Sequence, residues 1–298
     1  MNKKCVDAGR EGCPCVLAES GNCMVCSRLS GGSCNDCSWQ GVCIYSLFLQ
    51  NGRKRVSGRR SEVFAVKEIR TYSEDFKVFV LSVPRGLCQR AARPGSFVFA
   101  KRKEDRDWFG MPVSVLKSDP ERQELHLGIY NCGPKSNNLV MNQGPMEIRG
   151  IYYSALSGLS LLQKVTPRTL VYAKGVAIAP LRNLIDSGLV KPEKAYFYID
   201  ISKVSLDFIK DYFGDIPVDN MEFREFIIDG FDRKRLTSGS DNILALTSPF
   251  YSDRIEKTAG RACVRPNKGN MCCGEGICGA CTHTGELGET VRTCKFIP

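Results

Sequence analysis

The chain has 298 residues, of which 43% are hydrophobic and 25% are charged, and its formal charge at neutral pH is +10. This length suffices for two ordinary domains with hydrophobic cores and for additional small modules. No segment approaches the roughly 20 apolar residues that a membrane-spanning helix requires, and the start of the chain lacks the apolar core of a signal peptide. We therefore expect a cytoplasmic protein that binds no membrane.

Cysteine is unusually frequent, with 16 residues. In a chain without an export signal, so many thiols indicate metal ligands in a reducing compartment rather than disulfides, and we associate them with anaerobic metabolism. Basic runs at 53–55 and 59–60 favour acidic partners. Metal-bound thiolates would offset part of this positive charge, so nucleic acid is a disfavoured partner.

Eight of these cysteines lie in residues 1–52, which we call the N-terminal head. Two C-x2-C pairs in this head suit zinc and a 4Fe-4S cluster equally. We favour two four-ligand iron-sulfur sites, with structural zinc and then free thiols as the alternatives. The head is short and poor in aliphatic residues, so bound metal should supply much of its stability. The predicted ligands are Cys5, Cys13, Cys15, Cys23, Cys26, Cys34, Cys37 and Cys43.

After a polar, basic link at 51–60, residues 61–150 carry short β-rich runs separated by turns. Their regular spacing predicts a small antiparallel β-barrel. His126 alternates with apolar residues and is expected to be structural, and Cys88 and Cys132 are expected to be buried apolar residues. The predicted strands are 63–66, 76–83, 96–100, 112–116 and 125–130.

Residues 151–258 change to an alternation of strands and helices, which predicts a parallel sheet with helices on its faces. The chain is therefore expected to be an α+β multi-domain protein. It would combine an antiparallel β-barrel and an α/β nucleotide-binding domain, flanked by small metal-bound cysteine-rich modules. The predicted strands are 169–173, 194–199 and 242–246, and the predicted helices are 179–186 and 206–213.

Residues 259–298 contain the pattern C-x4-C-x2-C followed by a distant fourth cysteine, which is the plant-type spacing of a 2Fe-2S cluster. Gly274, Gly276 and Gly279 fit this interpretation, because a chain that wraps a cluster needs left-handed backbone that glycine adopts easily. Zinc and a disulfide knot are less favoured, since only one C-x2-C pair is present. The spacing fits Cys273 better than Cys272, and His283 is expected to be an exposed neighbour. The predicted ligands are Cys273, Cys278, Cys281 and Cys294.

The order of a barrel, an α/β domain and a C-x4-C-x2-C segment resembles two kinds of electron-transfer subunit. One belongs to the heterodimeric, NAD-dependent dihydroorotate dehydrogenases, and the other is the small subunit of the ferredoxin-dependent NADP transhydrogenases. Both belong to the ferredoxin-NADP reductase superfamily. The resemblance covers 61–298 and implies an FAD-binding barrel at 61–150, an NAD(P)-binding-like domain at 151–258 and a 2Fe-2S segment at 259–298.

In that superfamily, a strand of the form Arg-x-aromatic-Ser lies along the flavin after a Pro-Gly-Gln-Phe turn. Here Met111–Ser114 follows the turn Pro-Gly-Ser-Phe at 94–97, without the arginine and the aromatic ring. Ser114 keeps the hydroxyl group, and the loop 133–136 is similar to the family's second phosphate loop. The implied FAD-binding residues are Met111, Pro112, Val113, Ser114, Gly128, Tyr130, Gly133, Lys135 and Ser136.

The family's Gly-Gly-x-Gly-x-Ala-Pro motif lets the pyrophosphate of NAD(P) approach the backbone. Here the segment 174–180 reads Lys-Gly-Val-Ala-Ile-Ala-Pro, and the later Cys-Gly-Pro is Thr-Ser-Pro at 247–249. The Cβ of Ala177 should hinder the pyrophosphate, although Lys174 could compensate electrostatically. The implied NAD(P) residues are Gly175, Ala177, Pro180, Ser248 and Pro249.

Together these patterns predict an oxidoreductase subunit, an iron-sulfur flavoprotein that moves electrons between NAD(P)H, FAD, a 2Fe-2S cluster and a partner. The expected partner is a larger redox enzyme subunit or a ferredoxin, in a hetero-oligomer. No catalytic residue is predicted, because the flavin does the chemistry and the protein positions it. One alternative is a non-catalytic relay or scaffold with a degenerate nucleotide site. A zinc-dependent nucleic-acid binder with salt-sensitive affinity is the other.

Overall fold

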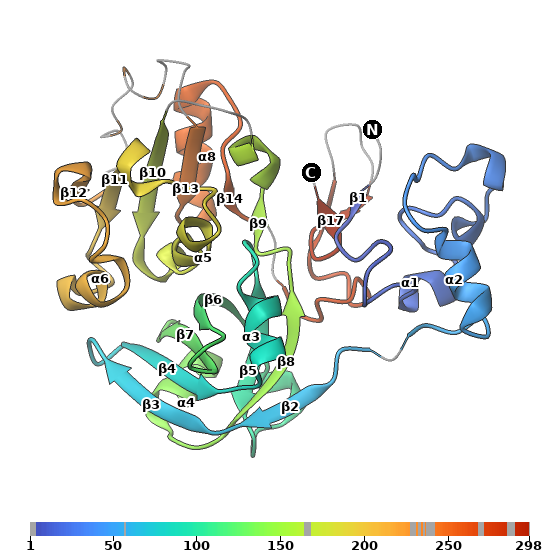
Figure 1. Ribbon diagram of the computed structural model, residues 1–298, viewed down its shortest axis with the longest axis horizontal. Coiled ribbons are helices and arrows are strands. Elements are labelled where there is room, and N and C mark those ends of the chain that lie inside the picture. The colour runs from blue at the N-terminus through green and yellow to red at the C-terminus, as the bar shows by residue number, and fades with distance from the viewer. Residues whose placement is uncertain are drawn as a thin grey trace. The chain divides into compact units, whose positions relative to one another are not determined.

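The structure is a computed structural model that describes residues 4–56, 58–163, 168–226, 231, 234, 236, 242–267, 271–284 and 290–297. The chain divides into two compact units (Figure 1). One unit joins Met1–Ser61 to Lys268–Pro298, and the other comprises Glu62–Asn267. The two ends of the chain, which the sequence analysis placed in separate modules, thus fold in one unit.

An antiparallel sheet of seven strands begins at the start of the Glu62–Asn267 unit, with the order β2-β8-β5-β6-β7-β4-β3. Its two edge strands are consecutive in sequence and are separated by Ala65 alone. The sheet must therefore curl until its edges approach, which gives it the character of the expected barrel. The strands are β2 (Ser61–Phe64), β3 (Val66–Thr71), β4 (Phe76–Ser82), β5 (Phe97–Arg102), β6 (Met111–Asp119), β7 (Glu124–Tyr130) and β8 (Met146–Tyr152).

Two helices that the sequence analysis did not predict, α3 (Arg85–Ala91) and α4 (Pro134–Met141), accompany this sheet. Cys88 of α3 is fully buried, as expected. The expectation for Cys132 is wrong, because this residue lies in the turn between β7 and α4 and is exposed. Strand β7 ends at Tyr130, so Cys132 no longer follows the alternation that buries the strand residues.

The second sheet of this unit is parallel, with the order β12-β11-β10-β13, as predicted. Its strands are β10 (Thr169–Lys174), β11 (Ala195–Asp200), β12 (Met221–Phe223) and β13 (Asn242–Leu246). Its helices are α5 (Leu181–Asp186), α6 (Leu206–Phe213) and α8 (Pro249–Ala259). A separate two-stranded sheet is antiparallel and consists of β9 (Leu156–Ser157) and β14 (Arg265–Pro266). The 3-10 helices of the unit are Asp107–Phe109, Leu159–Gln163, Gly175–Ile178, Pro192–Lys194 and Val218–Asn220.

Strand alternation decides how the barrel meets the α/β domain inside this unit. Phe76, Val78 and Leu116 point out of the barrel into the apolar core of the α/β domain. The ring of Phe76 meets the ring of Phe208 on α6 edge to face, with centroids 4.9 Å apart. The outer face of the barrel at these strands therefore packs against the α/β domain instead of facing solvent.

The unit formed by the chain ends is held by short elements around a small core. Its helices are α1 (Val16–Glu19) and α2 (Ile44–Gln50), with 3-10 helices at Arg28–Ser30 and Cys34–Asp36. Its strands are β1 (Lys4–Cys5), β15 (Thr282–Thr284), β16 (Thr290–Arg292) and β17 (Phe296–Ile297). Strands β1 and β17 pair antiparallel, with Cys5 opposite Phe296. No helix of the described residues is long and apolar enough to cross a bilayer.

Four charged side chains of this unit form a buried ion cluster of Asp7, Arg59, Glu275 and Lys295. The Lys295 Nζ lies 2.6 Å from Asp7 Oδ2 and 3.0 Å from Glu275 Oε2, and its side chain is 0% exposed. Arg59 reaches the same two carboxylates, at 2.6 Å and 3.3 Å. Burial alone would raise the pKa of Asp7, but Lys295 and Arg59 outweigh it and hold that pKa below its usual value. The ion cluster therefore joins the two ends of the chain by charge as well as by β-pairing.

The two histidines allow a test of this packing, because His126 is buried on β7 and His283 is exposed on β15. His126 Nδ1 lies 2.8 Å from the Tyr212 hydroxyl, and burial is the main reason that its pKa falls from 6.5 to about 4. The folded state therefore excludes a proton that the unfolded state accepts below pH 6.5. Stability should be complete above that pH and should fall by about 2 kcal/mol between pH 7 and pH 4.5 through this residue.

Urea unfolding at both pH values measures this loss, and His126→Gln should reduce it while His283→Gln should not. An equal pH dependence in the parent chain and His126→Gln would contradict the assignment.

Candidate functional site

The four cysteines of the C-x4-C-x2-C pattern come together in the structure, and we call them the C-terminal thiol set. Hydrogen bonds join the Cys273 thiol to Cys278 and to Cys294, and Cys294 also contacts Cys281. The β15–β16 hairpin brings the distant member close, because Thr293 N donates to Cys281 O at 3.2 Å. Within 271–284 the contact is made by Cys273, whereas Cys272 is exposed. The spacing thus identified a set of thiols that are neighbours in space.

The backbone around this set has the conformation that the glycines suggested. Gly274, Gly276 and Gly279 all have positive φ, between 69° and 74°. In that conformation amide groups turn toward the sulfur atoms, and Glu275 N donates to Cys273 Sγ at 3.3 Å. A Cβ at Gly276 would lie 3.1 Å from side-chain atoms of Leu17 and Lys295. All three glycines therefore serve the turn, and Gly276 also allows close packing against Leu17 of the N-terminal head and against Lys295.

The geometry suits a cluster better than a single ion. Each iron of a 2Fe-2S cluster takes two of four thiolates, so the four sulfur atoms need not converge on one point. Within the described residues, no three His, Cys, Asp or Glu side chains converge closely enough to bind one metal ion. The hydrogen bond from Cys294 is the main reason that the pKa of Cys273 falls to about 3. Burial raises the pKa of Cys278, and the hydrogen bond to Cys273 raises the pKa of Cys294, so among these three thiols only Cys273 favours the thiolate form that binds metal.

The structure divides the eight cysteines of the N-terminal head. Four of them line one cavity, and we call these the N-terminal thiol set: Cys5, Cys13, Cys15 and Cys23. Burial raises the pKa of Cys5 to about 12 and that of Cys13 to about 11. Cys26 is buried beside the set, and its N–H donates to Cys23 Sγ at 3.3 Å. The remaining three, Cys34, Cys37 and Cys43, are exposed.

The residues implied to bind FAD occupy one region of the barrel, where strand alternation separates them into two groups. Met111 and Val113 face the interior of the barrel and pack in its core. Pro112 and Ser114, next to them on β6, are exposed and half-buried respectively, and they share the outer face with Leu116. Ser114 pairs with Phe97 of β5. The outer face of β6 is thus open at Pro112 and partly open at Ser114, where a planar ligand could lie, whereas the α/β domain covers it at Leu116.

Strand β7 contributes two more implied residues to the same outer face. Gly128 and Tyr130 pair with Val78 and Phe76 of β4, whose side chains point outward. A Cβ at Gly128 would make ordinary van der Waals contact, 3.5 Å from the Phe76 ring, so packing does not by itself require glycine here. Tyr130 is half-buried, and the Lys203 ammonium lies 5.6 Å from the centre of its ring.

The implied phosphate loop is the N-terminal end of α4. The Ser136 hydroxyl accepts the N–H groups of Cys132 and Gly133, at 2.9 Å and 3.0 Å. Lys135 Nζ donates to Gly110 O at 3.2 Å. Two amides and the lysine therefore already have internal partners, and an anion at this loop would compete with them.

The implied NAD(P) turn follows β10. Gly175 has φ of +58° and starts a 3-10 helix that runs to Ile178, with Ala177 half-buried in it. Pro180 precedes α5, and Ser248 and Pro249 begin α8. Lys174 forms an ion pair with Asp200, whose carboxylate is completely buried. The charge of Lys174 is thus neutralised by Asp200. Lys174 is therefore not free to attract a pyrophosphate, which was its expected compensation for the missing glycine.

Sequence reasoning missed two residues of this region, Asp200 and Lys203. Asp200 stands opposite Lys174 in the parallel register of β10 and β11, and it also accepts the N–H of Phe226 at 2.8 Å. An acidic residue at the end of a predicted parallel strand was the available signal. Lys203 packs its stem 3.2 Å from the position of a Cβ on Gly175, while its ammonium lies over Tyr130. It therefore connects the nucleotide turn with the outer face of the barrel.

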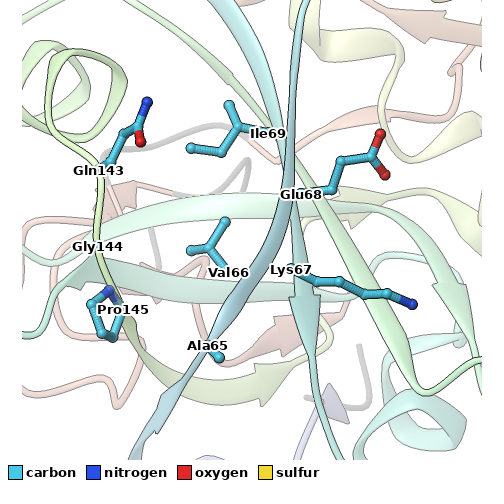
Figure 2. Close-up of a pocket in the computed structure, with 8 residues that line it drawn as sticks. All are labelled: Ala65, Val66, Lys67, Glu68, Ile69, Gln143, Gly144 and Pro145. Atoms are coloured by element: carbon cyan, nitrogen blue, oxygen red, sulfur yellow. The ribbon is translucent and has the colours of Figure 1, made fainter.

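A cavity of about 450 Å³ lies elsewhere on the barrel (Figure 2). Val66 and Ile69 of β3 point toward the segment 143–145, whereas Lys67 and Glu68 point away from it. None of its lining residues belongs to the implied flavin or nucleotide sites. We therefore do not assign the predicted cofactors to this cavity.

Comparison with solved structures gives fold-level similarities at low sequence identity. A structure described as an NADH-dependent reduced ferredoxin-NADP oxidoreductase matches with a TM-score of 0.55 and 17% identity, over 82% of this chain and 87% of that one. Phthalate dioxygenase reductase, described as a modular structure for electron transfer from pyridine nucleotides to [2Fe-2S], matches with a TM-score of 0.53 and 10% identity, over 80% and 95%. The chain shares the ferredoxin reductase fold.

An intact type IV self-sufficient cytochrome P450 monooxygenase also matches, with a TM-score of 0.52 and 12% identity, over 87% of this chain but 43% of that one. No protein-family profile matches the sequence. A search of curated proteins also finds no match. The similarity is therefore one of architecture, an antiparallel sheet followed by a parallel α/β domain.

The packing of Gly276 can be tested against a matched control. Gly21 has almost the same φ, +71° against +74°, but a Cβ there would meet nothing within 4 Å. Gly276→Ala should lower the free energy of unfolding by about 1–2 kcal/mol more than Gly21→Ala, because only the first adds overpacking to left-handed strain. Urea unfolding followed by circular dichroism measures the difference, and equal losses would show that Gly276 has room.

Proposed function

We propose that the protein is an iron-sulfur flavoprotein subunit that passes electrons between NAD(P)H and a partner redox protein. The observation that carries this proposal is the C-terminal thiol set, four cysteines with plant-type spacing that contact one another. The ferredoxin reductase fold of the chain supports it. The partner would be a larger oxidoreductase subunit or a ferredoxin, in a hetero-oligomer.

The C-terminal thiol set would hold a 2Fe-2S cluster, which exchanges one electron at a time when bound. Cys281 and Cys294 are buried and would anchor it, whereas Cys278 is exposed and would mark its solvent side. Amide groups such as Glu275 N would stabilise negative charge on the sulfur atoms. The exposed Ile277 beside Cys278 would lie where a partner approaches.

The outer face of the barrel would hold FAD, which can exchange a hydride on one side and single electrons on the other. Ser114 and Pro112 would lie along it, and Tyr130 would border it. Met111 and Val113 would contribute backbone only, since their side chains lie in the barrel core. At the 133–136 loop, Ser136 would have to release the amides that it now accepts.

NAD(P)H would enter beside Gly175, and we expect weak binding. Ala177 keeps its Cβ where the family has glycine, and Lys174 is occupied by Asp200. Lys203 would meet the nucleotide from the side of Tyr130. The alternative function, a relay or scaffold with a degenerate nucleotide site, rests on these same features. Anaerobic addition of NADH or NADPH discriminates the two, because only the first function predicts bleaching of the flavin.

A cysteine substitution tests the cluster directly. Cys278→Ser should abolish the reduced-state paramagnetic resonance of the cluster and should leave acid-releasable FAD in near-stoichiometric amount. Cys272→Ser is the matched control, because its exposed thiol is a chain neighbour of Cys273 but lies outside the thiol set. An unchanged resonance in Cys278→Ser, or an equal loss in Cys272→Ser, would refute the ligand assignment.

A second substitution tests the nucleotide site. Ala177→Gly should tighten the binding of NADH or NADPH several-fold, because it restores the room that a pyrophosphate needs near the backbone. Calorimetry on the anaerobically prepared protein measures the affinity, and an unchanged flavin content shows that the fold is intact. Tight binding by the unmodified chain would show that the Cβ is no obstacle.

A further inference from the structure

The N-terminal thiol set gathers cysteines from separate parts of the N-terminal head. Cys5 belongs to β1, Cys13 and Cys15 precede α1, and Cys23 follows it. Their common cavity is otherwise lined mainly by apolar side chains such as Leu17, Val25 and Ile44. Four thiols around one largely apolar cavity can supply the ligands of an iron-sulfur cluster, whose irons take different sulfur atoms, although no three of these thiols, all within the described residues, converge on one point.

The surroundings of this set repeat those of the C-terminal thiol set. In each, a backbone N–H donates to a cysteine sulfur at 3.3 Å, from Cys26 to Cys23 and from Glu275 to Cys273. Such bonds stabilise negative charge on sulfur and are a feature of metal-bound thiolates. The other head cysteines differ, because Cys34, Cys37 and Cys43 are exposed. The common cavity therefore distinguishes the group of four, since its members are half-buried, Cys26 is buried outside it, and Cys43 Sγ also accepts an amide, from Ser46 N at 3.5 Å.

The core of the head is too small to explain this burial by packing alone. Its buried members are Ala8, Ala18, Cys26, Leu29, Ile44 and Phe48, and Val6 and Leu17 of the head are buried as well. A segment with so few large apolar groups needs a further source of stability, and a bound metal is the usual one. The cavity has a free volume of about 20 Å³, room for about one water molecule, and no three of its thiols, which the structure describes in full, converge, so metal uptake would require the four thiols to move.

The buried ion cluster places this set close to the C-terminal one. Asp7 is two residues from Cys5, Glu275 is two residues from Cys273, and Lys295 adjoins Cys294. Asp7 and Glu275 share Lys295, and Val6 N donates to Lys295 O at 2.8 Å. Lys295 also interacts electrostatically with Cys15. One neutral network of two cations and two anions therefore separates the two thiol sets.

We propose that Cys5, Cys13, Cys15 and Cys23 bind a second metal centre, adjacent to the one at the C-terminal thiol set, and that Cys34, Cys37 and Cys43 are not its ligands. The shared chemistry is four-thiolate binding of a thiophilic metal, as an iron-sulfur cluster or as zinc. That this centre would lie next to a 2Fe-2S cluster rests on the proposed function. The assignment of Cys5, Cys13, Cys15 and Cys23 as ligands does not depend on it. With iron the second centre would extend the electron path, and with zinc it would fix the fold of the head.

Metal and sulfide analysis of anaerobically purified full-length protein tests the ligand set. Cys15→Ser should lose all metal beyond the two irons of the C-terminal cluster, and Cys34→Ser should lose none. Loss of iron and sulfide identifies a cluster, and loss of zinc identifies a structural ion. Equal losses in both variants, or no metal beyond two irons in the parent, would overturn the proposal. In a Cys278→Ser background, Cys15→Ser should still remove the metal of the N-terminal thiol set. A wrong assignment of the C-terminal cluster can therefore be told apart from a wrong assignment of the N-terminal site.

Alkylation of the unmodified protein guards against a variant that fails to fold. In the native state Cys34, Cys37 and Cys43 should react at once, and the N-terminal thiol set should react only after a chelator has removed the metal. Peptide mapping by mass spectrometry reads both steps. If the four thiols remain unreactive in the chelated, still folded protein, burial alone protects them and the site is refuted. Disulfide-linked peptides among the four would refute it equally.

Discussion

The fully buried ammonium group of Lys295 constrains the unit that contains all the predicted metal ligands. A buried charge is tolerated only when it is paired and hydrogen-bonded, and here Asp7 and Glu275 supply the two carboxylates, at 2.6 Å and 3.0 Å. One comes from the first residues of the chain and the other from the turn between two cluster cysteines. The ends of the chain must therefore fold together, and the Glu62–Asn267 unit is an insertion between them.

Inside that inserted unit, the alternation of strand residues creates the surface that a flavin would use. Pro112, Ser114, Gly128 and Tyr130 lie on one face of the sheet because their positions differ by two along β6 and β7. The same face continues into the packing surface around Phe76, which holds the α/β domain. The nucleotide turn is thereby brought to the flavin face, and Lys203 joins the two by contacting Gly175 and Tyr130.

The departures from the reductase pattern have a common electrostatic consequence. Lys174 replaces a glycine, but the buried Asp200 neutralises it, so the turn gains no net charge for a pyrophosphate. Arginine is also missing from the flavin strand, where Met111 points into the barrel core. Neither Met111 nor Lys174 thus offers a free cation to the predicted cofactor sites of the inserted unit. The cysteine-bearing unit, in contrast, keeps the complete plant-type cysteine pattern, with Cys281 and Cys294 buried and Cys278 exposed, which places the stronger chemical signature at the chain ends.

The sequence by itself determined the classes of the elements, since periodicity and turns depend on neighbouring residues. It placed α6 and β13 at their observed bounds, and its choice of Cys273 over Cys272 as a ligand stays a prediction. It missed the short helices α3 and α4, which leave little periodic signal, as well as helix α8 and strand β8, and it placed Cys132 inside when it lies in an exposed turn. Only the tertiary structure decided which of the eight head cysteines share a cavity, that Lys174 is paired with Asp200, and that the chain ends meet. These depend on contacts between residues far apart in sequence, which local pattern cannot encode.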